Sequence, residues 1–150
     1  MELVPEAYEV LRLHTKSWGL VTGTSVSDPK EVGTDCRLLQ DLCPKPNPDF
    51  SNFMLTRWAW EKVGPFDEGF EGAYCEDADY HVRLHRAGVP AFSIDLPVLH
   101  HRSSTLRFSE PEEKAKIVEY GTKNRERFRK RYGCMPYGAK YDKLFMGEST

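Results

Sequence analysis

Residues 72–88, GAYCEDADYHVRLHRAG, constrain the fold most, because a glycine-interrupted loop gives way within them to a helix. Gly88 is a stop signal for that helix. The next stretch, VPAFSIDLPVLHH (89–101), has the alternating and apolar pattern of one or two short strands broken by Pro97. A helix followed closely by buried strand sequence is typical of an α/β protein.

The rest of the first hundred residues repeats this alternation of helix and strand signals. Proline at the start, glycine at the end and apolar residues at helical spacing predict a first helix. The predicted elements up to residue 64 follow in this order: a helix (5–18), a strand (19–28), a long loop punctuated by Pro, Gly and Asp (28–50), a strand (52–57) and a short helix (58–64).

The last third of the chain has a different, more charged character. Ser109 and Glu112 have the spacing of a capping box, in which each side chain satisfies a free backbone N–H. A long charged helix is expected from there to about Arg131, weakened at Gly121, followed by an extended tail. We therefore predict one domain over residues 1–150, with residues 109–150 as its C-terminal helix and tail.

Length and composition exclude several classes of protein. The 150 residues are 39% apolar and 29% charged, as in a globular domain, and the net charge of −2 gives no general attraction to nucleic acid or membrane. No run of eighteen apolar residues and no secretion signal occurs, so a cytoplasmic location is expected. The cysteines form no C-x-x-C pair and are expected as reduced thiols, a Cys36–Cys43 disulfide being the alternative; they are Cys36, Cys43, Cys75 and Cys134.

The acidic residues at the start of the helix are the first candidates for chemistry. Asp77 and Asp79 have the letters of a D-x-D metal motif, but residues two apart on a helix point about 200° apart and do not grip one ion easily. Asp79 is expected to pair with Arg83 at an exposed site. Glu76 and Asp77 fall in the first turn, where the helix dipole keeps them ionised, either as caps or as a general base.

His100 and His101 end the apolar strand that follows. Adjacent residues on a strand face opposite sides, so at most one of them is expected to share a site with Asp77. A structural or surface role is the alternative for both.

These pieces, in this order, resemble the C-terminal half of the inverting family 2 glycosyltransferases, which have the GT-A fold. The matching run covers residues 53–104, about a third of the chain. Its matching parts are the strand ending at Arg57, the turn Gly64-Pro65-Phe66-Asp67-Glu68, the pair Glu76-Asp77, Asp79 with Arg83, the close at Ala87-Gly88, and His100. The tail is also similar to a family ending in which Tyr132 stands where tryptophan is usual.

The resemblance implies a partial GT-A-like fold, with a short mixed sheet flanked by helices. It implies transfer of a sugar from a nucleotide-sugar donor to an acceptor hydroxyl with inversion. Asp77 would be the general base, Glu76 would orient it, and His100, or alternatively His101, would help hold a divalent Mn or Mg cation. The acceptor side would be lined by Trp58, Trp60, Phe66, Tyr74 and Cys75, with core packing as the alternative role for at least half of them.

Family members begin with a nucleotide-binding half that ends in a D-x-D, and neither precedes Met1 in this sequence. The chain is therefore expected to need a partner that supplies the missing half, or self-association, and to be inactive alone. A non-catalytic saccharide- or partner-binding module is the alternative. Contact with nucleic acid is a third possibility, less favoured than a solvated helix face, and it rests on the basic residues Lys123, Arg125, Arg127, Arg129, Lys130 and Arg131.

Overall fold

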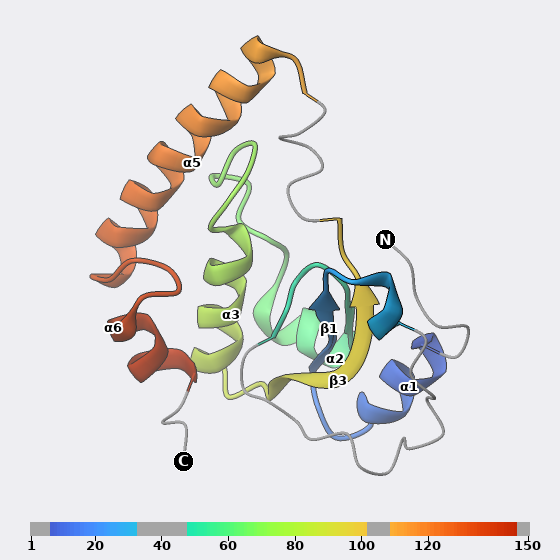
Figure 1. Cartoon of the computed structure of the whole chain (residues 1–150). Coiled ribbons are helices and arrows are strands. Elements are labelled where there is room, and N and C mark those ends of the chain that lie inside the picture. The colour runs from blue at the N-terminus through green and yellow to red at the C-terminus, as the bar shows by residue number, and fades with distance from the viewer. Residues whose placement is uncertain (1–6, 33–47, 102–108, 147–150) are drawn as a thin grey trace. The chain divides into compact units, whose positions relative to one another are not determined.

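The computed structural model describes residues 7–32, 48–101 and 109–146 of a mixed α/β chain (Figure 1). The chain divides into two compact units, one made of Met1–Gly64 and Leu84–Arg102 and the other of Pro65–Arg83 and Ser103–Thr150. Neither unit is continuous in sequence. The expectation of a single domain stays a prediction, and Cys36 and Cys43 lie outside the described residues.

The first unit contains a small mixed sheet. Its described strands are β1 (Leu20–Val26), β2 (Phe53–Leu55) and β3 (Ala91–Leu99), in the order β2-β1-β3. β1 is antiparallel to β2 and parallel to β3. The predicted short mixed sheet is therefore confirmed.

Residues 91–99 form one strand and not two. The pairing of β1 with β3 shifts between Thr22 and Thr24, and Pro97 lies opposite Thr24 just beyond the shift. Gly23 lies at the irregularity, where a Cβ would approach a side-chain carbon of Val98 to 2.7 Å. Asn52 Oδ1 accepts the Gly23 N–H at 2.9 Å. A side chain thus replaces a ladder partner at the point where the register changes.

One helix covers this sheet and a second begins directly after β2. Helix α1 (Ala7–His14) is shorter than the predicted 5–18, and its Val10 and Leu11 pack with Val21 and Ile94 in the core of the unit. A 3-10 turn, η1 (Pro29–Glu31), follows β1. Helix α2 (Arg57–Val63) begins after Thr56, whose hydroxyl accepts the Ala59 N–H.

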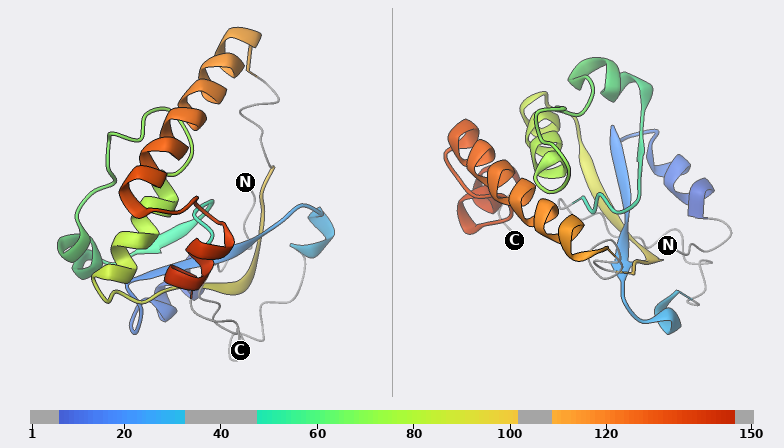
Figure 2. Two further views of the ribbon diagram at one scale, coloured as in Figure 1. Left: turned by 90° about the vertical axis from the view of Figure 1, so that its left-hand side faces the viewer. Right: turned by 90° about the horizontal axis from the view of Figure 1, so that it is seen from above.

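The second unit is helical. Its elements are the start of α3 (Glu76–Arg86), α5 (Pro111–Tyr132), α6 (Ala139–Tyr141) and the π-helical turn η3 (Asp142–Met146). Helix α5 runs alongside α3 in both Figure 1 and Figure 2. Ala78 and Val82 of α3 share a buried cluster with Phe128 of α5 and Tyr141 and Phe145 of the C-terminal segment.

Two expectations for this part of the chain are wrong. Helix α5 begins at Pro111 after Glu110, with no side-chain cap hydrogen bond, so Ser109 and Glu112 do not form the predicted capping box. Proline suits the first helical position because it needs no hydrogen-bond partner for an N–H. The predicted extended tail is helical over residues 139–146, because Tyr141 and Phe145 turn to one side and are buried.

None of the helices in the described part of the chain combines the length and the apolar character needed to cross a bilayer.

Candidate catalytic site

Side chains of α5 hold the loop that precedes α3. The amide nitrogen of Asn124, which is buried, donates to the carbonyl oxygens of Glu71 and Ala73 at 2.8 Å each. Gly72 has φ +74°, and a Cβ at this position would approach the ring of Tyr120 to 2.3 Å. The loop can therefore lie this close to α5 only with glycine at position 72.

Two strained residues connect this loop to α3. Tyr74 and Cys75 have φ of 73° and 75°, in the left-handed region that non-glycine residues rarely adopt. Each such residue costs about 1 kcal/mol or more, and strain of this kind clusters at functional sites. The Tyr74 ring packs over Gly121, and Cys75 is buried in the core, so packing maintains the turn. This turn lets α3 begin at Glu76.

Asp77 lies in the first turn of α3, as the sequence predicts. Its Oδ1 accepts the N–H of Ala78 at 2.7 Å, and its Oδ2 accepts the hydroxyl of Tyr137 at 2.7 Å. Among the described residues no Lys or Arg forms an ion pair with Asp77. The carboxylate is therefore held by neutral donors.

Glu76, its neighbour, is in a different electrostatic state. Burial raises the pKa of Glu76, and the charge of Asp77 adds to this, although a hydrogen bond to its own backbone acts in the opposite direction. Its Oε2 is buried without a hydrogen-bond partner in the part of the chain that the structure describes. This direction opposes the expectation that the first-turn position keeps Glu76 firmly ionised.

Both carboxylate oxygens of Asp79 accept hydrogen bonds from other side chains. Its Oδ2 accepts from Arg83 Nε at 2.9 Å, and its Oδ1 accepts from Arg131 Nη1 at 2.7 Å and from the Tyr132 hydroxyl at 2.6 Å. The predicted pair with Arg83 is confirmed, but the exposed setting is wrong, since the Asp79 side chain is 0% exposed. Asp77 and Asp79 thus have separate partners, as expected for residues two apart on a helix.

Asp67, in the turn after α2, extends this network. Its Oδ1 accepts the Gly69 N–H at 2.8 Å, and its Oδ2 pairs with Arg131 at 2.6 Å and with Arg127 at 3.3 Å. The Gly69 N–H first, and then the two guanidinium groups, lower the pKa of Asp67 to about 2. This pairing is not visible in the sequence pattern, because Asp67 and Arg131 are far apart in the chain.

The residues predicted to line the acceptor side are in varied surroundings. In the second unit, Phe66 stacks on Tyr80 with ring centroids 4.2 Å apart, and Tyr74 is 43% exposed. Cys75 is 4% exposed, and burial raises the pKa of its thiol to about 11, so it serves the core. Trp58 and Trp60 are exposed on α2 in the first unit. Their convergence with Tyr74 stays a prediction.

The candidate metal ligands follow β3 in the first unit. The backbone N–H of His100 donates to the Val26 carbonyl at 3.0 Å, and His100 is partly buried whereas His101 is exposed. The described residues contain no group of three His, Cys, Asp or Glu side chains that could hold a metal ion. A divalent cation requires several ligands, so a single imidazole does not make its site. The role of His100 with Asp77 stays a prediction.

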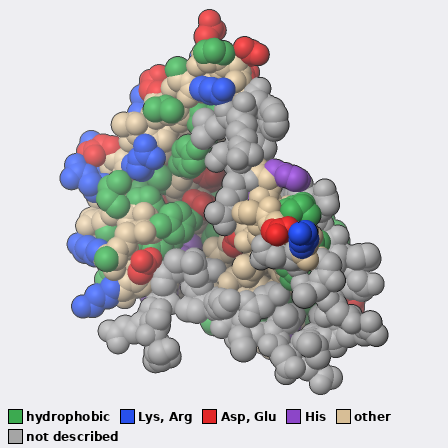
Figure 3. Space-filling view, viewed as in Figure 1, with side chains coloured by type: hydrophobic (Ala, Val, Ile, Leu, Met, Phe, Trp, Pro, Cys, Tyr) green, Lys and Arg blue, Asp and Glu red, His purple; other side chains and the backbone are tan. Residues whose placement is uncertain are grey.

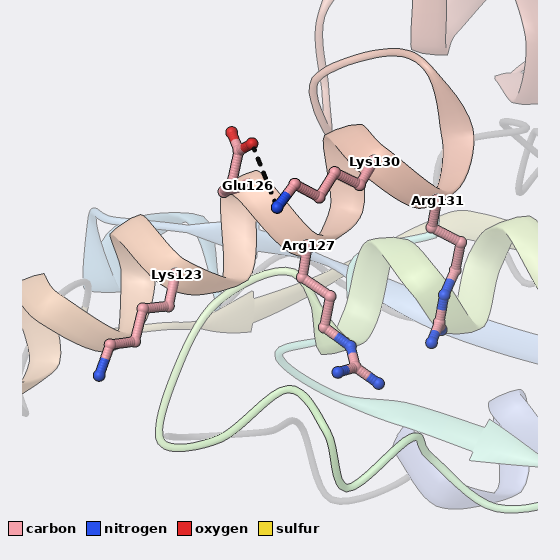
Figure 4. A pocket seen from close by; sticks show the side chains of 5 residues that line it. All are labelled: Lys123, Glu126, Arg127, Lys130 and Arg131. Carbon is pink, nitrogen blue, oxygen red and sulfur yellow. Dashed lines mark ion pairs between the residues drawn. The ribbon is translucent and has the colours of Figure 1, made fainter.

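Four of the six basic residues that suggested contact with nucleic acid lie together on α5. Lys123, Arg127, Lys130 and Arg131 line an open hollow of about 600 Å³ together with Glu126 (Figure 4). Acidic groups compensate much of this charge, since Glu126 pairs with Lys130 at 3.9 Å and Asp67 pairs with both arginines. Basic and acidic side chains are also interspersed over this part of the surface in Figure 3. This compensation favours a solvated helix face.

Comparisons of the chain with protein-family models, with curated proteins and with solved structures found no match.

Proposed function

We propose that this chain carries the acceptor-side, general-base part of an inverting glycosyltransferase that uses a nucleotide-sugar donor, with Asp77 as the base. The observation that supports the proposal is the contrast between two carboxylates that lie two residues apart on the same helix. Asp77 is held by neutral donors in the first turn of α3, whereas Asp79 is neutralised by Arg83 and Arg131.

This contrast matters because a general base must accept a proton. Both oxygens of Asp79 already accept hydrogen bonds, one from Arg83 and the other from Arg131 and Tyr132, and its side chain is 0% exposed, so it is not open to an acceptor hydroxyl. Glu76 is less suitable for another reason, because its Oε2 is buried without a hydrogen-bond partner in the described part of the chain and is not open to an acceptor hydroxyl. Asp77 is therefore the best base of the three, and Glu76 is assigned to orienting it.

The proposed reaction is a single displacement. The acceptor hydroxyl oxygen forms a bond to the anomeric carbon of the sugar while the bond from that carbon to the diphosphate oxygen breaks. The hydroxyl proton passes to Asp77, and the nucleoside diphosphate leaves with the electron pair of the broken bond. Attack from the face opposite the leaving group inverts the configuration. The strained turn at Tyr74 and Cys75 supports a functional role for this end of α3.

The cation that the resemblance implies is not fitted by the described residues, which bring together no set of ligands for it. No step is therefore assigned to a metal. A second chain or a partner that binds the donor is part of the proposal, with the chain contributing the base.

The test is release of nucleoside diphosphate from a panel of UDP-, GDP- and dTDP-sugars, with hydroxyl acceptors and Mn²⁺. Asp77→Asn is expected to lower the rate at least about 100-fold, the usual contribution of a general base. Glu61→Gln is the matched control, because it also removes one carboxylate charge, in this case at an exposed position on α2. Equal and measurable rates for the wild type and Asp77→Asn would contradict the assignment of the base.

A further inference from the structure

Tyr137 approaches the proposed base from a segment sixty residues away. Its hydroxyl lies 2.7 Å from Asp77 Oδ2, while its backbone has φ +54°, again in the left-handed region. In the described part of the chain, the non-glycine residues with positive φ are Tyr74, Cys75 and Tyr137. Two of the three immediately precede Glu76-Asp77 and the third contacts Asp77, so the strain is concentrated around one carboxylate.

The segment that carries Tyr137 is anchored in the core of the second unit. Tyr141, one helical turn later, is fully buried, and its hydroxyl lies 2.7 Å from Nδ1 of the buried His81 on α3. The Tyr141 ring packs 5.3 Å from the rings of both Tyr137 and Phe145. Helix α3 is therefore hydrogen-bonded to this segment through Asp77 and through His81, in addition to the apolar contacts of Ala78 and Val82.

Before Tyr137, the segment is tied to the end of α5. Gly133 closes α5 in the left-handed conformation, and its carbonyl accepts from Lys140 Nζ at 2.9 Å. This contact bends residues 133–140 into a closed loop with Tyr137 near its middle. Tyr137 is 49% exposed, so part of it faces solvent beside Asp77.

We infer that Tyr137 is a positioning residue for the proposed base, holding the Asp77 carboxylate in one orientation through its hydroxyl. The effect of this positioning on sugar transfer rests on the proposed function. Ala78 N–H fixes one oxygen of the carboxylate and Tyr137 fixes the other, so both rotations of the side chain are restricted. A base held in one orientation does not have to be ordered when the acceptor binds.

The surrounding charges keep Tyr137 in the donor state. Packing around the phenol and the charge of Asp77 raise the pKa of Tyr137 above the ordinary tyrosine value, so the hydroxyl keeps its proton at neutral pH. The charge of Asp77 also raises the pKa of Glu76, Cys75 and Tyr141, which are neighbouring groups without positive charge.

The first experiment measures orientation without activity. Three-bond NMR couplings to the Asp77 β-protons are expected to report a single side-chain rotamer in the wild type and averaged rotamers in Tyr137→Phe. Tyr8→Phe, at an exposed position on α1, is the matched control and is expected to leave the couplings unchanged. Chemical denaturation confirms that each variant is folded. Unchanged couplings in a folded Tyr137→Phe variant would overturn the inference.

The second experiment connects orientation to transfer. Tyr137→Phe is expected to lower kcat about tenfold while the KM for the acceptor changes less than about twofold, because the base is misplaced and not lost. A raised KM with unchanged kcat would overturn the inference by making Tyr137 an acceptor contact. Averaged couplings in Tyr137→Phe, together with equal and measurable transfer rates for the wild type and Asp77→Asn, would overturn the proposed function and leave the orienting role supported.

Discussion

Arg131 on α5 donates to Asp79 on α3 at 2.7 Å, across 52 residues of sequence. The aspartate is fully buried, whereas the arginine side chain is 34% exposed and pairs on its outer side with Asp67. This ion pair joins the helix that carries the proposed base to the long C-terminal helix. We therefore expect loss of this ion pair to lower the free energy of unfolding and to leave substrate binding unchanged.

Asp79→Asn tests this contact. Removing one partner of a buried ion pair leaves the other charge uncompensated, so the variant should lose about 3 kcal/mol of the free energy of unfolding. Urea denaturation monitored by circular dichroism measures the change. Glu126→Gln, which breaks an exposed pair with Arg129 on the same helix, should cost less than about 1 kcal/mol. Similar losses in the two variants would contradict the central role of Asp79.

Asp67 predicts a dependence of stability on acidic pH. The pKa of its carboxyl is lowered from 3.8 to about 2 in the folded chain, so its contribution is present above the unfolded value and is lost as the pH falls toward 2. Asp67→Asn should therefore flatten the fall in the free energy of unfolding between about pH 4 and about pH 2. Denaturation curves of both proteins at several pH values would show it. Parallel pH profiles would refute the pairing with Arg131.

The raised pKa of Glu76 predicts a pH dependence of stability with the opposite sign to that of Asp67. A carboxyl whose pKa is raised on folding stabilises the protein below its ordinary value of 4.5 and loses that contribution as the pH rises through the folded value. Glu76→Gln should therefore be more stable than the wild type at pH 7. At about pH 4 the advantage should be smaller. A variant that is less stable at pH 7 would mean that Glu76 has a favourable ionic partner.

Gly121 predicts a coupling with Tyr74. Alanine normally stabilises a helix relative to glycine by about 1 kcal/mol, but a Cβ at position 121 would approach a ring carbon of Tyr74 to 2.8 Å. Gly121→Ala should therefore destabilise the chain, and the same change in a Tyr74→Ala background should stabilise it. A double-mutant cycle measured by thermal unfolding tests the reversal. Additive effects would show that the ring moves aside without cost.

Local sequence signals predicted the helices and strands of this chain well, whereas they predicted few of its long-range contacts. The short helix after Thr56 and the end of α5 near Arg131 follow from a cap and a glycine that act within one turn. The strand over residues 91–99 was also recognisable from its apolar pattern, although Pro97 hid its continuity.

The rest depends on partners that are distant in sequence. The i,i+4 rule identifies Arg83 as a partner of Asp79, but Arg131 and Tyr132 are more than fifty residues away, so the burial of Asp79 was not visible. The helical form of residues 139–146 likewise depends on the burial of Tyr141 against α3 and α5. The contact of Tyr137 with Asp77 follows from that helical segment, and the sequence pattern gave no sign of it.

The position of Phe145 in the core of the second unit has a consequence for synthesis of the chain. Residues 84–102 complete the first unit while residues 65–83, which belong to the second, are already made. Those nineteen residues stay incompletely packed until Tyr141 and Phe145, which cover the apolar side of α3, have been synthesised. A nascent chain that pauses before residue 145 would expose this surface, and chaperone binding should be strongest during that interval.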